Sequence, residues 1–172
     1  MNEIQGQLDA KGKRFAIIAA NFNEAIVDRL IAGASGMLRK LGARAEDITL
    51  VRVPGAFEIP PVALRLGRSG SFDAVICLGA VIRGATPHFE HVAGESARGI
   101  AHAARESPVP VVYGVLTTDT IEQAVERAGT KAGNKGADAA AAAVEMADLY
   151  AAIERDLGKE LGREYGKPSS RR

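Results

Sequence analysis

Ala74-Val75-Ile76-Cys77-Leu78 is an unbroken apolar run near the middle of the chain, and it decides the fold class. Its length and its β-branched residues indicate a strand, and the absence of alternating polar residues indicates that both faces of that strand are covered. Three other apolar runs are similarly rich in β-branched residues, so the sequence predicts four strands in total. The other three runs are residues 15–19, 48–53 and 109–116.

Helical patterns separate and follow these apolar runs. Residues 24–41 place apolar side chains on one stripe of a helix, and Gly42 follows as a typical helix stop. Alternation of strand and helix is typical of a parallel sheet with helices on both faces. The sequence therefore predicts an α/β fold, and a doubly wound open sheet is favoured. The other predicted helices are residues 59–68, 89–105, 120–128 and 132–157, the last starting near Gly136.

The two ends of the chain are predicted to lie outside this domain. A length of 172 residues suits one domain, which we place at residues 14–157. Residues 1–13 are predicted to be an N-terminal arm, in which Glu3-Ile4-Gln5-Gly6 is expected to add an edge strand to the sheet. Residues 158–172 are predicted to be a polar C-terminal tail.

Composition and charge exclude several classes of protein. The formal net charge is +1, so no strong field would attract nucleic acid or an anionic membrane. No run reaches the ~18 apolar residues of a membrane span. The single cysteine, Cys77, excludes an internal disulfide and disfavours a cysteine-based metal site. We therefore expect a soluble, cytoplasmic protein without a bound metal.

The segments that follow the predicted strands form the candidate site, because open α/β sheets bind ligands beyond the carboxyl ends of their strands. These segments are residues 21–23, 54–58, 79–91 and 117–120. Phe22 and Phe57 lie in these predicted loops. A loop phenylalanine can stack on a flat ligand ring, or it can simply close the edge of the core.

Two segments have the composition of an anion site. Gly84-Ala85-Thr86 precedes a helix, where free backbone N–H groups and the helix dipole favour an anion, although Thr86 is equally suited to a simple N-cap. Residues 127–136 are rich in glycine and contain three cationic side chains, among them Arg127. Arginine can bind a phosphate through two hydrogen bonds, but a solvated surface loop is the alternative for this segment.

His88 is the candidate for proton transfer, because imidazole exchanges protons near neutral pH. One alternative is a histidine that faces water at the start of a helix. Another is a zinc site shared with His91, since residues three apart lie on one helix face. Zinc needs a third protein ligand, and the sequence offers only Glu90 or Glu95 nearby. These residues indicate a phosphate-bearing ligand and a proton-transferring histidine, but they name no reaction.

Five segments, in order, resemble the 6,7-dimethyl-8-ribityllumazine synthase family of riboflavin biosynthesis. They are Asn21-Phe22-Asn23 and residues 53–60, 79–89, 114–118 and 121–136, and the resemblance covers about residues 14–150. It implies a flavodoxin-like three-layer αβα sandwich around a central four-stranded parallel sheet. It also implies that 5-amino-6-(D-ribitylamino)uracil condenses with 3,4-dihydroxy-2-butanone 4-phosphate, with release of phosphate and water and without a cofactor.

The resemblance implies a role for each matching residue on the uracil side of the site. Phe22 would stack on the pyrimidine ring, and His88 would transfer protons. The ribityl chain and the ring would be held by Ala56, Phe57 and Glu58, and the ring pocket would be lined by Ala80, Val81 and Ile82.

On the phosphate side, the resemblance implies that Ala85 and Thr86 bind the phosphate, with Arg127 opposite and Lys135 nearby as a polar support. Tyr113 departs from the family pattern, which often has phenylalanine at that position. Its added hydroxyl needs a hydrogen-bond partner if it is buried.

The resemblance also implies a homopentamer in which neighbouring chains share each site. Tyr113 and Arg127 would come from one chain, and Phe22 and His88 from the next. Some members of the family pack twelve pentamers into a 60-mer, and the uninterrupted residues 129–136 leave that assembly open here. Two other functions stay open as well: a riboflavin synthase of the lumazine-synthase-like type, and a non-catalytic cage that binds flavin or lumazine.

Overall fold

A sheet of four parallel strands in the order β2-β1-β3-β4 forms the centre of the molecule. The strands are β1 (Phe15–Ala20), β2 (Ile48–Val53), β3 (Ala74–Ile82) and β4 (Val111–Thr118). This arrangement comes from a computed structural model, which describes the backbone of residues 1–165 and the side chains of residues 1–157. The predicted parallel sheet of four strands is confirmed.

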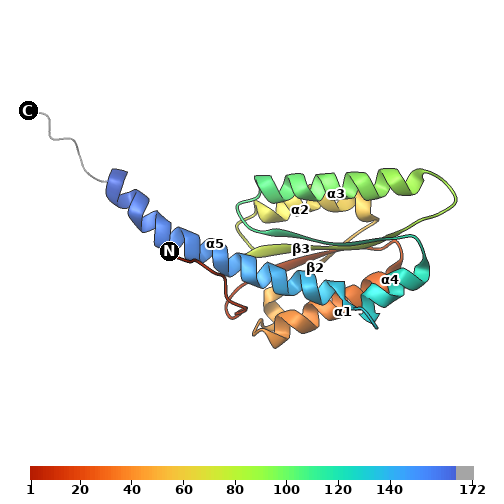
Figure 1. Cartoon of the computed structure of the whole chain (residues 1–172), viewed down its shortest axis with the longest axis horizontal. Helices are drawn as coiled ribbons and strands as arrows, with labels where there is room; N and C mark the ends of the chain where they lie inside the picture. The colour runs from red at the N-terminus through yellow and green to blue at the C-terminus, as the bar shows by residue number, and fades with distance from the viewer. Residues whose placement is uncertain (166–172) are drawn as a thin grey trace, which may run out of the picture.

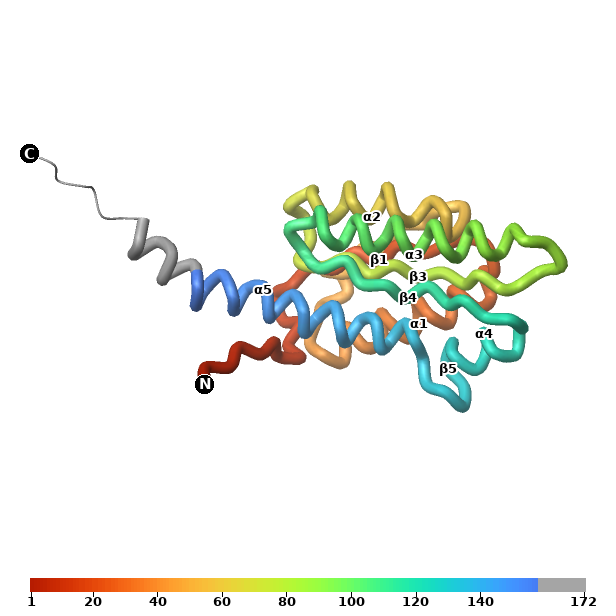
Figure 2. The backbone as a smooth tube through the Cα atoms, turned by 45° about the horizontal axis from the view of Figure 1, so that its top comes forward, coloured from red at the N-terminus to blue at the C-terminus, as the bar shows by residue number. Residues whose placement is uncertain are grey.

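Helices cover both faces of the sheet (Figure 1). On one face, α1 (Glu24–Lys40) packs against α5 (Lys135–Tyr165), with the short α4 (Ile121–Arg127) beside them. On the other face, α2 (Ile59–Gly67) packs against α3 (His88–Glu106). Figure 2 shows the same two helical layers from a second direction. The predicted three-layer αβα sandwich is therefore confirmed.

Side chains of β1 and β3 alternate between two cores, because successive residues of a strand face opposite ways. In β1, Phe15 and Ile17 belong to the core beneath α1 and α5, whereas Ala16 and Ile18 belong to the core beneath α2 and α3. The Cys77 thiol is also buried in this second core, and burial raises its pKa, so it stays protonated as a packing group. Burial on both faces explains the unbroken apolar runs of the sequence.

β3 is longer than predicted. The prediction ends at Leu78, whereas the strand continues to Ile82 because β4 pairs with it over that whole length. Gly79 lies opposite Val115, and Ile82 lies opposite Thr118. The residues from Gly79 to Ile82 therefore belong to the sheet, and the loop that follows begins at Arg83.

The predicted edge strand at residues 3–6 is wrong. Residues 1–13 contain no strand, and they are bonded to α5 instead. The Asp148 carboxylate accepts a hydrogen bond from the Gln7 N–H at 2.9 Å and pairs with the Lys13 ammonium at 3.0 Å. These two contacts lower the pKa of Asp148. Asp148 of α5, and not a strand of the sheet, therefore holds the arm at Gln7 and Lys13.

The glycine-rich segment after α4, for which a solvated surface loop was one alternative, forms a small hairpin. Its strands, β5 (Ala128–Thr130) and β6 (Gly133–Asn134), are antiparallel. The Asn134 amide holds this hairpin in place by donating to the carbonyls of Arg29 at 2.8 Å and Ala128 at 3.0 Å. Its Oδ1 accepts from the N–H groups of Gly136 and Ala137 at 2.8 and 3.1 Å, which caps the start of α5.

The predicted start of α5 near Gly136 is confirmed, whereas its predicted end at residue 157 is too early. The helix begins at Lys135, directly after the capping Asn134, and its backbone continues past Leu157 to Tyr165. The remaining part of the predicted tail, residues 166–172, lies outside the described residues. No helix in the described part of the chain combines the length and the apolar character that a bilayer crossing requires.

Candidate active site

The candidate site lies where the strand order reverses. The chain runs from β1 to β2 on one side and then returns to β3 on the other side of β1, so a crevice opens beyond the carboxyl ends of β1 and β3. A cavity of about 700 Å³ lies there. Sites for small molecules have volumes of roughly 300–1,000 Å³, so the cavity is large enough for a bicyclic ligand with a side chain.

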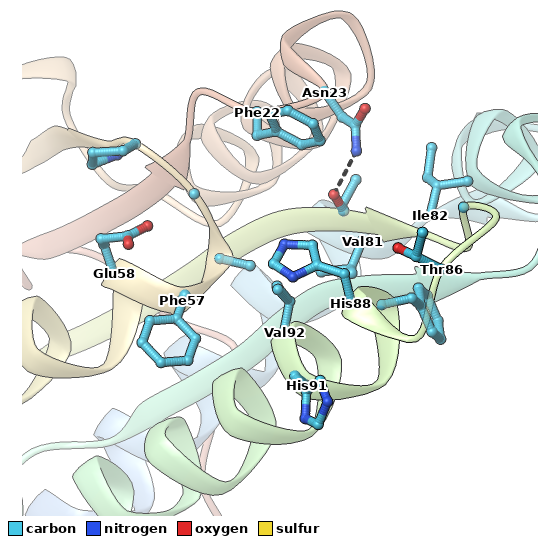
Figure 3. Close-up of a pocket in the computed structure, with 16 residues that line it drawn as sticks. Phe22, Asn23, Phe57, Glu58, Val81, Ile82, Thr86, His88, His91 and Val92 are labelled. Atoms are coloured by element: carbon cyan, nitrogen blue, oxygen red, sulfur yellow. Dashed lines mark hydrogen bonds between the residues drawn. The ribbon is translucent and has the colours of Figure 1, made fainter.

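Most of the predicted site residues meet in this cavity. The predicted residues that line it are Phe22, Ala56, Phe57, Glu58, Ala80, Val81, Ile82, Thr86 and His88. Other residues line it as well: Asn23, Pro54, Gly55, Gly84, Phe89, His91 and Val92. These residues come from the segments after β1 and β2, from the end of β3 and the loop after it, and from the first turns of α3, as the labelled side chains in Figure 3 show.

A strained turn after β1 presents Phe22 to the cavity. Asn23 is the only non-glycine residue of the described chain with positive φ, at 60°, a conformation that asparagine tolerates better than most residues. Its Nδ2 donates to the Ala80 carbonyl at 2.8 Å (Figure 3). The Phe22 ring is left 72% exposed at the cavity. Sequence reasoning missed Asn23 as a site residue, although an asparagine just before a helix was a usable signal.

A 3₁₀ turn, η2 (Ala56–Glu58), forms a second wall of the cavity. The Glu58 N–H donates to the Gly55 carbonyl at 3.3 Å, which closes the turn. A Cβ at Gly55 would lie 3.2 Å from Oε2 of Glu58, so the carboxylate folds back over this glycine. Phe57 keeps 55% of its surface exposed, while Ala56 is buried. The second aromatic ring is therefore available to a ligand.

The loop between β3 and α3 leaves backbone donors free. Pro87 occupies the N-cap position of α3 and no side chain caps the helix, so the alternative that Thr86 is an N-cap residue is wrong. The N–H groups of Gly84, Ala85 and Thr86 make no hydrogen bond to any described residue. Exposed backbone donors of this kind, next to a helix start, suit an anion.

His88 is the first residue of α3, and its imidazole reaches toward the middle of the cavity (Figure 3). His91 lies one turn further along the same helix and also lines the cavity. Among the described residues, no three His, Cys, Asp or Glu side chains are grouped closely enough to hold a metal ion. The arrangement places the His88 imidazole in a cavity that two aromatic rings, the His91 imidazole and a loop with free backbone donors also line.

Comparison with known proteins identifies the family. The family model for 6,7-dimethyl-8-ribityllumazine synthase matches residues 12–151. The chain belongs to this family. It is 62% identical over 122 residues to the 6,7-dimethyl-8-ribityllumazine synthase of Nitratidesulfovibrio vulgaris strain Miyazaki F, which is 71% of this chain and 78% of the relative. The enzymes of the same name from Desulfatibacillum aliphaticivorans and Desulfosudis oleivorans are 58% and 57% identical over 122 residues, covering 71% of this chain and 79% and 78% of the relatives.

Membership in the lumazine synthase family confirms the resemblance that the five sequence segments indicated. It does not bring every predicted residue into the cavity of one chain. Ala85 lies in the exposed loop beside the cavity, and Tyr113, Arg127 and Lys135 come from elements that do not line it.

Tyr113 lies on β4 and lines a second, smaller hollow of about 450 Å³ together with Arg83 and Asp119. The ring is 41% exposed. Partial burial raises the pKa of Tyr113, and the nearby Ser96 side chain opposes that rise.

Arg127 and Lys135 flank the β5–β6 hairpin. Arg127 ends α4, and its guanidinium donates to the Gln123 carbonyl at 3.3 Å, with no carboxylate partner among the described residues. Lys135 begins α5 and pairs with Asp138 at 2.8 Å. The Arg127 guanidinium thus keeps most of its donors for an anion, whereas the Lys135 ammonium already has a carboxylate partner.

Proposed function

We propose that this chain condenses 5-amino-6-(D-ribitylamino)uracil with 3,4-dihydroxy-2-butanone 4-phosphate to give 6,7-dimethyl-8-ribityllumazine, the penultimate step of riboflavin biosynthesis. The observation that carries the proposal is the cavity at the strand reversal, where a flat-ring pocket, free backbone donors and His88 meet in a chain of this family. The matching relatives bear the synthase name, which favours condensation over riboflavin synthesis from lumazine.

The uracil substrate occupies the part of the cavity between β1 and β3. Phe22 stacks on the pyrimidine ring, which its exposed face allows. Ala56, Phe57 and Glu58 hold the ring and the ribityl chain, and the end of β3 closes the pocket through Ala80, Val81 and Ile82.

The phosphate of the second substrate binds at the loop before α3. Ala85 and Thr86 offer free backbone N–H groups, and Thr86 adds a hydroxyl. Arg127 of a neighbouring subunit completes the site, with Lys135 as a polar support and Tyr113 at the pocket edge. The absence of these three residues from the cavity of a single chain supports a site shared between subunits.

His88 serves the proton transfers. The uracil 5-amine attacks the ketone and water leaves, which gives an imine. Phosphate is then eliminated, and the resulting enol tautomerises. The ribitylamine nitrogen attacks the remaining carbonyl, and loss of a second water closes the ring. Each step moves a proton, which an imidazole at the centre of the cavity can serve, and holding two substrates in register supplies much of the remaining acceleration.

A homopentamer is the assembly that we propose, with a 60-mer of twelve pentamers as its larger form. The proposed site requires no metal or redox cofactor, because the reaction needs only proton transfers and two leaving groups. We place the enzyme in the cytoplasm, where a buried, unpaired Cys77 stays reduced.

Incubation of the full chain with both substrates tests the function, with product followed by the absorbance of the lumazine. Formation of lumazine only when both substrates are present supports the proposal. Riboflavin formed from lumazine alone would identify a riboflavin synthase instead, and tight flavin binding without turnover would identify a non-catalytic binding protein.

Replacing Arg127 with alanine is expected to raise the KM for the butanone phosphate by about 10- to 100-fold, because one charge-assisted contact to phosphate is lost. The KM for the uracil should stay within about twofold. Steady-state kinetics with each substrate varied in turn measures both values. Arg39→Ala is the matched control, because Arg39 is an arginine in the last turn of another helix, α1, and does not line the cavity. Equal rises in both KM values would contradict a specific phosphate role.

A further inference from the structure

Arg83 joins three elements around the loop that carries the free backbone donors. Its Nε donates to Asp119, which follows β4, at 2.7 Å, and its Nη1 donates to Glu90 of α3 at 2.5 Å. Its guanidinium carbon lies 4.3 Å from the centroid of the Phe89 ring. The Arg83 N–H also donates to the Thr118 carbonyl at 2.9 Å. One side chain thus links the end of β4 to the first turn of α3.

The loop itself has few other restraints. Residues 84–87 are exposed, and the N–H groups of Gly84, Ala85 and Thr86 bond to no described residue. A Cβ at Gly84 would meet nothing within 4 Å. Within residues 1–165, the hydrogen bonds at the two ends of this loop are those of Arg83 and the turn in which Glu90 N–H donates to the Pro87 carbonyl at 3.0 Å. The shape of the loop therefore depends on how its ends are held.

We propose that Arg83 is a positioning residue that fixes the β3–α3 loop in the conformation that binds phosphate, acting through Asp119 and Glu90. This inference rests on the function proposed above. The two carboxylates hold the guanidinium beside the loop, so its main contacts are with the protein. Hydrogen bonds to these carboxylates also raise the pKa of Arg83.

The direction in which one substitution changes phosphate affinity distinguishes a positioning role of Arg83 from direct contact with the phosphate. Asp119→Asn weakens the contact to Arg83 and also removes a negative charge near the phosphate. If Arg83 bound the phosphate directly, this change would leave phosphate affinity unchanged or increase it. If Arg83 positions the loop, the same change loosens the loop and decreases phosphate affinity.

The experiment measures binding of inorganic phosphate by titration calorimetry, together with steady-state kinetics, on the full assembled protein. Arg83→Met is expected to weaken phosphate binding and raise the KM for the butanone phosphate by about fivefold to tenfold, with the uracil KM within about twofold. Asp119→Asn and Glu90→Gln should each weaken phosphate binding by about twofold to fivefold. The double variant with Arg83→Met and Asp119→Asn should bind phosphate no more weakly than Arg83→Met alone, because both changes break the same linkage.

Arg98→Met is the matched control, since Arg98 forms an exposed ion pair with Glu95 in α3, the helix that also contains Glu90. It should change neither phosphate binding nor kinetics. Native mass and circular dichroism show whether each variant folds and assembles, and Arg83→Lys, which keeps the charge without the planar fork, replaces Arg83→Met if the latter does not fold.

Unchanged phosphate binding in Arg83→Met, or tighter binding in Asp119→Asn, would overturn the positioning role while an active unaltered enzyme would keep the proposed function. The opposite result is also distinguishable. If the unaltered protein did not condense the two substrates, the proposed function would be overturned. Weaker phosphate binding in Arg83→Met and Asp119→Asn would still support the role of Arg83.

Discussion

His88→Ala is expected to lower kcat by about 10²- to 10⁴-fold, the usual contribution of a positioned general acid or base. The imidazole reaches the middle of the cavity, and each proposed step of the condensation moves a proton there. The KM values should change less, because the aromatic rings and backbone donors that hold the substrates are retained. Steady-state formation of lumazine, at saturating concentrations of both substrates, measures the effect.

His102→Ala is the matched control for this experiment. His102 is an exposed histidine in the same helix, α3, and it does not line the cavity. Its replacement should leave kcat within about twofold. Native mass should show the same assembly for both variants. A kcat for His88→Ala equal to that of the unaltered enzyme would remove His88 from the mechanism.

Gly136→Ala is expected to destabilise the protein by about 3 kcal/mol, because there is no room for a methyl group where α5 crosses α1. A Cβ at Gly136 would lie 2.1 Å from the Leu30 carbonyl oxygen and 2.9 Å from the Leu30 Cα. These are backbone atoms of a packed helix, so they cannot move aside as a flexible side chain would. Urea unfolding at fixed protein concentration measures the change in the free energy of unfolding.

Gly36→Ala provides the comparison, because Gly36 lies in α1 and a Cβ there would meet nothing within 4 Å. Alanine is the better helix former, so this change should stabilise the protein by up to ~1 kcal/mol. If the two variants unfolded at the same urea concentration, close packing at Gly136 could not be the reason for its glycine. The same crossing lies next to Lys135, so Gly136→Ala should also disturb the Arg127 side of the site.

The architecture was predictable because burial leaves a direct trace in the sequence. β1 and β3 are covered on both faces, and their unbroken apolar runs are enough to predict burial on both faces. The rule that ligands bind beyond the carboxyl ends of parallel strands then selected the segments that line the cavity. It placed Phe22 and His88 in candidate segments, and both line the cavity.

Several features were not predictable in this way, because they depend on neighbours distant in the sequence. The end of β3 is set by its pairing with β4, and not by the apolar run. The N-terminal arm follows Asp148, a partner that no local pattern in the arm reveals. Asn134 holds the hairpin through the Arg29 carbonyl, more than one hundred positions away in the chain.

The sequence by itself determined the order of strands and helices, the faces they bury and the chemical types present at the strand ends, because each of these leaves a local periodic or compositional signal. Only the tertiary structure decided that the Asn23 side chain bonds to the Ala80 carbonyl, that Arg83 links β4 to α3, and that Arg127 lies outside the cavity of its own chain. Such contacts join segments whose meeting depends on the packing of the whole sheet and its helices. A pattern within one segment has no means of encoding them.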